Sequence, residues 1–76
     1  TKPSINWDHV APDYKWLARD SDGDAFLYMS EPHVDFEDHE LGWWNTAGDA
    51  IHPAAFASYT PGTCDWKDSL VKRPEA

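Results

Sequence analysis

The pentapeptide DSDGD, residues 20–24, stands between two short aromatic-rich runs, YKWLAR (14–19) and AFLYMS (25–30). Asp-Gly between such runs is a strong signal for a β-hairpin, because glycine readily adopts the positive φ that a tight turn requires. Pro32 stops the second run, since proline has no amide to donate to a sheet. We therefore expect Gly23 to reverse the chain and to place the two runs side by side as antiparallel strands.

Both runs carry apolar side chains at neighbouring as well as alternate positions. In the first run Trp16 and Ala18 share one face of a strand, while Leu17 lies on the other. A strand with apolar residues on both faces is either central in a sheet or meets a partner with one face. The sequence therefore leaves both of these arrangements open for the two strands.

The same acids also resemble a calcium-binding loop. Asp20, Asp22, Asp24 and Glu31 fall at positions 1, 3, 5 and 12 of the EF-hand template. That template needs glycine at position 6, where Ala25 stands, and a helix on each side, where aromatic runs stand. We interpret the stretch as a hairpin turn and keep a weak cation site of the three aspartates as the alternative.

The segments around this hairpin are less regular. Residues 1–13 contain Pro3 and Pro12, so we expect an extended lead-in that contacts the core through Trp7 and Val10. Residues 33–41 contain few apolar side chains and are expected to form a solvent-facing connection.

A second hairpin is expected from the sequence GWWNTAGDAI. Trp43 and Trp44 precede an NTAGD turn in which Asn45 and Gly48 tolerate positive φ, and Pro53 ends the returning strand. If both tryptophans belong to one strand, their rings face opposite sides, so one can lie in the core while the other joins a surface patch. The alternative is that the tail and the lead-in cover both rings.

The tail predicts a short C-terminal helix. Thr63 or Asp65 is a candidate N-cap, and Trp66 stands four residues before Leu70 on the same helical face. Pro74 then stops the helix. The expected fold is thus α+β and mostly β: a single small domain, residues 1–76, with an antiparallel sheet of two hairpins and a short C-terminal helix.

Charge and cysteine content limit the classes of partner. Fourteen acids against six bases give a net charge of -8, which repels phosphate backbones and anionic lipid surfaces. The single Cys64 cannot form an internal disulfide, and no apolar run is long enough to span a membrane. We therefore expect a cytosolic protein with no direct nucleic-acid binding and no membrane association.

Catalytic and metal-binding patterns are weak. The four histidines, at positions 9, 33, 39 and 52, lack the spacing of zinc motifs, and Asp65 next to Cys64 disfavours a thiolate. No serine stands in a nucleophile motif. We expect no catalytic residues, no metal and no cofactor, so the chain is not predicted to be an enzyme.

Acids and tryptophans instead suggest a binding surface. Eight of the fourteen acids lie within residues 20–40, and tryptophan is enriched at the energetic centres of protein interfaces. The candidate partner-binding residues are Glu31, Asp35, Glu37, Asp38, Glu40, Trp43 and Trp44.

A pattern along almost the whole chain resembles small proteins encoded by tailed bacteriophages. The pattern is W-x-x-x-A-P, then L-A-x-D-x-D-G, a central tryptophan and D-W-x-x-S-L-x-x-R-P. Here it comprises Trp7, Ala11, Pro12, Leu17, Ala18, Asp20, Asp22, Gly23, Trp43 or Trp44, Asp65, Trp66, Ser69, Leu70, Arg73 and Pro74. The resemblance implies a phage origin and a place in the cytoplasm of a bacterial host, and it carries no catalytic residues.

We expect a non-catalytic phage accessory protein that binds a host or phage protein through an acidic and aromatic surface. One alternative is a DNA mimic that inhibits a nucleic-acid enzyme, since many small acidic phage proteins bind host enzymes. Another is a structural or assembly protein that forms homo-oligomers through an unprotected edge strand. A small hydrolase or metal enzyme would need His33 and His39 in one concave site with Glu31, Glu37 and Glu40.

Overall fold

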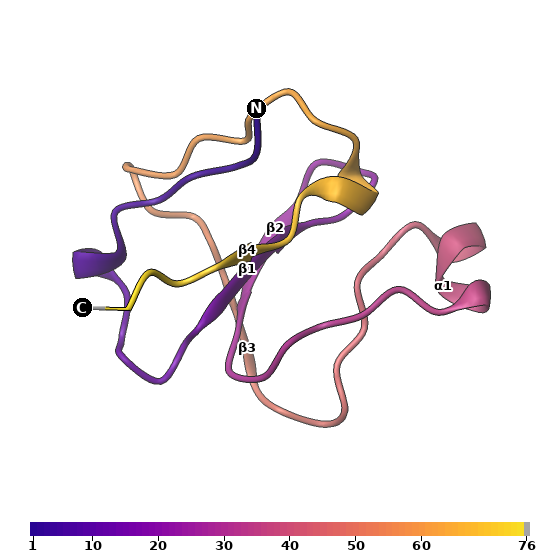
Figure 1. The fold of residues 1–76 in the computed structure, drawn as a ribbon, viewed down its shortest axis with the longest axis horizontal. Coiled ribbons are helices and arrows are strands. Elements are labelled where there is room, and N and C mark those ends of the chain that lie inside the picture. The colour runs from indigo at the N-terminus through magenta and orange to yellow at the C-terminus, as the bar shows by residue number, and fades with distance from the viewer. Residues whose placement is uncertain (76) are drawn as a thin grey trace.

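A computed structural model describes residues 1–75, and its centre is a four-stranded antiparallel sheet with strand order β3-β2-β1-β4 (Figure 1). The strands are β1 (Trp16–Arg19), β2 (Ala25–Tyr28), β3 (Ile51–Pro53) and β4 (Val71–Lys72). The helical elements are the 3-10 turns η1 (Trp7–His9) and η2 (Trp66–Asp68) and one α-helix, α1 (Phe36–Leu41). Within the described residues no helix has the length and apolar character needed to cross a membrane.

The first hairpin is confirmed. β1 and β2 pair with Leu17 opposite Leu27, and the amide of Gly23 donates to the carbonyl of Asp20 at 3.0 Å. Gly23 has φ +94°, in the region that glycine adopts without steric cost. The Asp22 carboxylate accepts from the amide of Asp24 at 3.0 Å, which tightens the turn. The stretch thus forms a turn closed by a glycine.

Of the two arrangements expected for β1 and β2, the structure shows the central one, because β4 and β3 flank them. Leu17 and Leu27 share one face of the sheet, where they form the core with Ile5 and Val10 of the lead-in and with Ala54. On the other face Ala18 and Tyr28 are buried.

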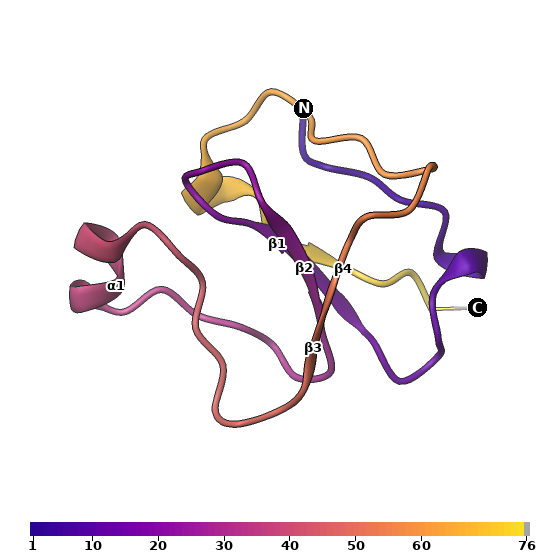
Figure 2. The ribbon, with the colours of Figure 1, turned by 180° about the vertical axis from the view of Figure 1, so that it is seen from behind.

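The N-terminal lead-in covers the core face. As expected, Val10 is buried and Trp7 packs against the core. The lead-in runs beside residues 55–61, where Ser4 and Thr60 form an antiparallel bridge (Figure 2). The amides of these two residues donate to each other's carbonyls at 2.9 and 2.8 Å.

The second hairpin was predicted wrongly. β3 pairs with β2, placing His52 opposite Leu27, and Trp43 and Trp44 form no strand with it. Trp44 instead donates its indole N–H to the carbonyl of Arg19, at the end of β1, and to that of Trp66 in η2. An indole N–H that is withdrawn from water needs such a partner, so a tertiary contact prevails over the local turn signal.

The C-terminal helix was also predicted wrongly. Asp65 precedes only the short 3-10 turn η2, after which the chain extends as β4 and pairs with β1. The Ser69 hydroxyl, fully buried, accepts from the amide of Arg19 at 2.9 Å and donates toward the carbonyl of Trp66 at 2.6 Å. These bonds fix the tail against β1, and Val71 then adopts the extended backbone that β-branched residues favour.

The one α-helix of the described chain lies in its middle, where we expected a connection. Asp35 and Asp38 form a reciprocal capping box at its start, and Gly42, with φ +79°, ends it. Capping thus supports a helix of six residues that has few apolar side chains to bury.

Candidate functional site

Residues 33–45 leave the sheet, carry α1 at their tip and return, and we call this segment the arm. At its base, His33 and Asn45 exchange two backbone hydrogen bonds of 2.8 Å each. Figures 1 and 2 show α1 on the side of the molecule away from the lead-in and the C-terminus. The arm is therefore a closed loop whose tip projects from the sheet.

The turn of the first hairpin anchors the returning half of the arm. The amide of Ser21 donates to the carbonyl of Gly42 at 2.8 Å, and the amide of Trp44 donates to Oδ1 of Asp20 at 2.9 Å. The indole N–H of Trp44 reaches the carbonyls of Arg19 and Trp66, both at 3.1 Å. Asp20 and Ser21 of DSDGD thus help to hold a neighbouring segment in place.

Burial of the Asp20 carboxyl raises its pKa, and the nearby Asp22 and Asp24 act in the same direction, while the bond from Trp44 lowers it. The surroundings of Asp20 thus disfavour its ionised form. Its carboxylate also has a structural task as the acceptor for the Trp44 amide.

Helix α1 reverses the usual pattern of burial. Phe36 is 86% exposed and Leu41 54% exposed, whereas Asp38 is only 5% exposed. Oδ2 of Asp38 accepts from the amide of Asp35 at 3.0 Å, so the buried acid serves the capping box. Trp43, just after the helix, is 48% exposed. The tip of the arm therefore offers three large apolar side chains to solvent.

Acids accompany these apolar side chains. Glu40 stands four residues after Phe36, and Glu37 four residues before Leu41, so each pair shares a helical face. Both glutamates are exposed. The exposed surface of the arm is consequently apolar and anionic together.

The two histidines of the arm have separate local partners. Nε2 of His33 lies 3.3 Å from Oδ2 of Asp35, and the ring of His39 packs edge-on against Trp66, with 6.5 Å between the ring centroids. Among residues 1–75 no three His, Cys, Asp or Glu side chains come together as metal ligands. A metal enzyme would need several of these side chains around one ion, and the described residues do not gather them in that way.

The predicted partner-binding residues divide into two groups. Glu31, Asp35, Glu37, Glu40 and Trp43 are exposed. Asp38 and Trp44 are committed to internal hydrogen bonds.

Sequence reasoning overlooked Phe36 and Leu41, the most exposed large apolar side chains of the chain as described. A signal for them was present, because Asp35 and Asp38 have the spacing of a helix cap. A helix that begins there has few apolar residues, and these find little apolar surface to pack against. Whether the arm binds a partner stays a prediction.

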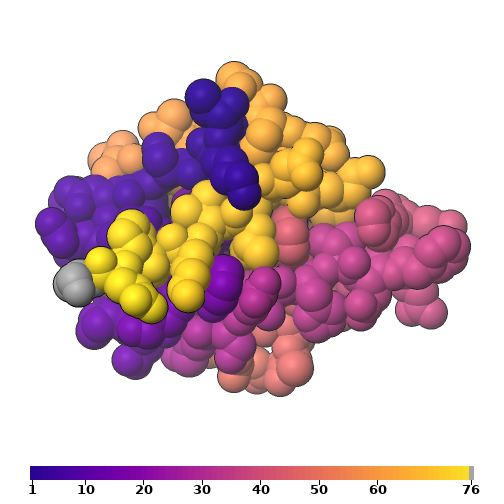
Figure 3. Space-filling view, in the orientation of Figure 1, coloured from indigo at the N-terminus to yellow at the C-terminus, as the bar shows by residue number. Residues whose placement is uncertain are grey.

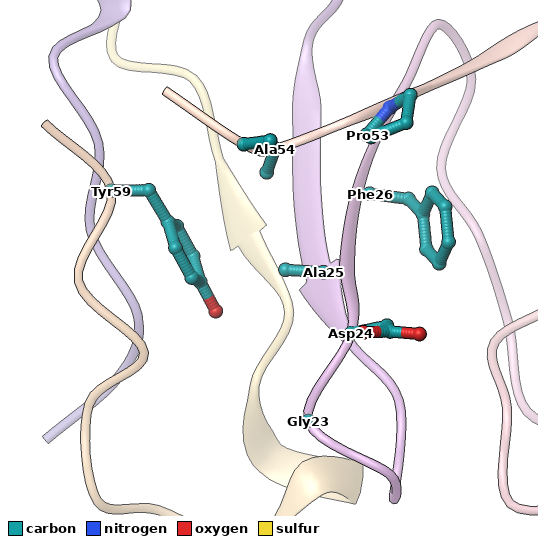
Figure 4. Close-up of a pocket in the computed structure, with 8 residues that line it drawn as sticks. Gly23, Asp24, Ala25, Phe26, Pro53, Ala54 and Tyr59 are labelled. Atoms are coloured by element: carbon teal, nitrogen blue, oxygen red, sulfur yellow. The ribbon is translucent and has the colours of Figure 1, made fainter. Parts of the chain in front are cut away.

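The hollows on the surface of the described chain include the following two. The first, about 410 Å³, lies where Ala25 and Ala54 sit between the rings of Tyr59 and Phe26 (Figure 4). The Tyr59 hydroxyl is buried without a hydrogen-bond partner, and burial raises its pKa. The second hollow, about 470 Å³, is lined by Lys15, Trp16, Lys72, Arg73, Pro74 and Glu75.

Comparisons with protein-family models, curated proteins and solved structures give no match for this chain.

Proposed function

We propose that this protein is a non-catalytic binding module that engages another protein through the tip of the arm. The observation that carries the proposal is the inverted burial of α1, which buries Asp38 and exposes Phe36. Covering an exposed phenylalanine side chain contributes about 1.5–3 kcal/mol, a stabilisation that the free protein lacks. A partner that covers Phe36, Leu41 and Trp43 would supply it.

The charge of the arm indicates which partners fit. Glu37 and Glu40 lie beside the apolar side chains, and the whole chain carries a net charge of -8. Complementary charge speeds association and excludes wrong partners more than it adds affinity. The partner surface is therefore apolar at its centre and basic at its rim.

The biological setting that we propose is the cytoplasm of a bacterial host, with the protein acting as a phage accessory factor. This rests on the resemblance of its motifs to small phage proteins. The partner would then be a host or phage protein.

The DNA-mimic alternative has less support. A mimic needs carboxylates displayed over a broad surface, but Asp38 is buried and Asp20 accepts a bond from the Trp44 amide. The apolar tip would contribute more to contact than an array of charges.

Self-association through edge strands also has less support. The amide of Ala54 donates to the carbonyl of Ala25. Because hydrogen-bonded and non-hydrogen-bonded pairs alternate along an antiparallel ladder, the backbone nitrogen of the neighbouring residue, Pro53, faces away from β2. Proline has no N–H, so this position offers no donor to another strand. On the other edge, the exposed Lys72 is closely followed by Pro74. Prolines and lysines are residues that protect sheet edges from pairing.

Affinity capture with the immobilised chain tests the proposal. We expect proteins retained from bacterial lysate by the parent chain to be lost by the variant Phe36→Ala with Leu41→Ala. Ile51→Ala is the matched control, because Ile51 is 45% exposed but lies on β3, outside the arm. Equal capture by the arm variant, with its thermal unfolding unchanged, would refute the proposed role.

A further inference from the structure

The second hollow is a place where basic and apolar groups meet. Three of the six basic residues of the chain, Lys15, Lys72 and Arg73, line it together with Trp16. Arg73 directs its guanidinium to backbone carbonyls of residues 7–14, so the two lysines supply the accessible charge. We call this the basic hollow.

In the basic hollow, the ammonium of Lys72 lies near both an aromatic ring and a carboxylate of the same chain. The ammonium of Lys72 lies 5.8 Å from the centroid of the Trp16 ring and 4.0 Å from Oε1 of Glu75. Glu75 is highly exposed, and a pair of this kind contributes little to stability, so another carboxylate can replace it at small cost. The hollow thus combines a ring surface with cations that can pair with an incoming acid.

The arm carries the complementary groups. Its tip combines the exposed rings of Phe36 and Trp43 with the carboxylates of Glu37 and Glu40. We propose that the arm of one molecule docks in the basic hollow of a second copy, with an apolar side chain against Trp16 and the glutamates near the lysines. This inference rests on the proposed role of the arm as a binding surface and names its partner.

The two surfaces lie apart on the molecule, so one copy does not close on itself. Figure 3 shows the C-terminal segment next to residues near β1, while the arm occupies the opposite end of the longest axis. An arm that binds a hollow elsewhere on the next copy makes a head-to-tail contact, which continues from copy to copy unless it closes into a ring. Association of this kind uses different residues from edge-strand pairing.

The strength of the contact follows from its size and charge. A six-residue helix in a shallow hollow buries less than a standard interface, so we expect a dissociation constant on the order of 10⁻⁴ to 10⁻³ M. The net charge of -8 on each copy opposes approach. Salt screens this long-range repulsion more than it screens partly buried local pairs, so moderate salt favours the assembly.

Sedimentation equilibrium from micromolar to millimolar concentration tests the inference. We expect the weight-average mass of the parent chain to rise with concentration. An arm variant, Glu37→Lys with Glu40→Lys, and a hollow variant, Lys15→Glu with Lys72→Glu, are each expected to stay monomeric. Mixing the two variants restores opposite charges between the arm of one variant and the hollow of the other, so the mass of the mixture is expected to rise again.

Lys67→Glu is the control, because Lys67 lies outside both surfaces and pairs at 3.9 Å with Asp65. It should leave association unchanged, and circular dichroism should show that all variants fold alike. A parent chain that remains monomeric at millimolar concentration and moderate salt would overturn the inference. So would association that survives both charge reversals, or a mixture that stays monomeric.

These outcomes are independent of the lysate experiment. If the parent chain is monomeric and the arm still captures a protein from lysate, the proposed function stands and the partner is a different chain. If the variant Phe36→Ala with Leu41→Ala abolishes capture but not self-association, the second copy is not the partner of the arm.

Discussion

The guanidinium of Arg73 lies over the indole ring of Trp7, 5.4 Å from its centroid, and donates to the carbonyl of the same residue at 2.9 Å. It also donates to the carbonyls of Ala11 at 2.9 Å and Tyr14 at 3.0 Å. One side chain after β4 thus holds the N-terminal lead-in, which covers the core. The two ends of the chain are joined by a cation and several carbonyls.

Replacing Arg73 by lysine should lower the free energy of unfolding by roughly 2–3 kcal/mol. Lysine keeps the charge but lacks the planar fork that reaches several carbonyls at once, and hydrogen bonds from charged donors contribute about 1.5–3 kcal/mol each. Urea denaturation measures the change. Lys67→Ala, which removes an exposed cation, should change stability by less than about 0.5 kcal/mol; similar losses for both variants would contradict the role of Arg73.

Ser69→Ala should destabilise the protein by about 1–3 kcal/mol, because it leaves the amide of Arg19 without its acceptor in a fully buried site. The loss should be accompanied by faster hydrogen exchange at that amide, measured by NMR. Ser30→Ala, at an exposed position after β2, is the control. Unchanged exchange at Arg19 would show that Ser69 does not hold the tail against β1.

Gly42→Ala should loosen the arm. Its φ of +79° is costly for alanine, by about 1–2 kcal/mol, and the added Cβ would overlap Oγ of Ser21. Gly23→Ala is the comparison, since it has φ +94° but open space around the added carbon. Thermal unfolding should show a larger loss for Gly42→Ala, and Ser21→Gly should relieve only the excess. Equal losses at the two glycines would argue against close contact at position 42.

The Asp20 carboxyl makes the stability of the protein depend on pH. Its pKa is raised above the ordinary 3.8, chiefly by burial, so the folded state holds its proton more firmly than the unfolded state does. This contribution is fully present below 3.8 and is lost as pH rises through the folded-state pKa.

Asp20→Asn keeps an oxygen acceptor for the amide of Trp44 and removes the charge. We therefore expect the difference in unfolding free energy, variant minus parent, to be more positive near pH 7 than at about pH 3. Urea denaturation at the two pH values checks this. A difference that does not change with pH would contradict a raised pKa at Asp20.

Local signals were sufficient where the structure depends on near neighbours. The turn at Gly23 needs only a glycine with positive φ and an aspartate that bonds two residues ahead, and both are visible in DSDGD. The apolar residues on both faces of the first two strands left two possibilities, a central position in the sheet or a face that meets a partner, and the structure shows the central position. The acids and Trp43 could be chosen as surface candidates from composition and position, while their partner could not.

The sequence by itself therefore determined the first hairpin and the mostly β character of the fold. Only the tertiary structure decided where Trp44 turns, why the tail extends after Ser69, and that Phe36 faces solvent. The physical reason is distance along the chain. The indole N–H of Trp44 donates to the carbonyls of Arg19 and Trp66, and the hydroxyl of Ser69 accepts from the amide of Arg19. The two members of each pair are far apart in the sequence, so no local window contains both.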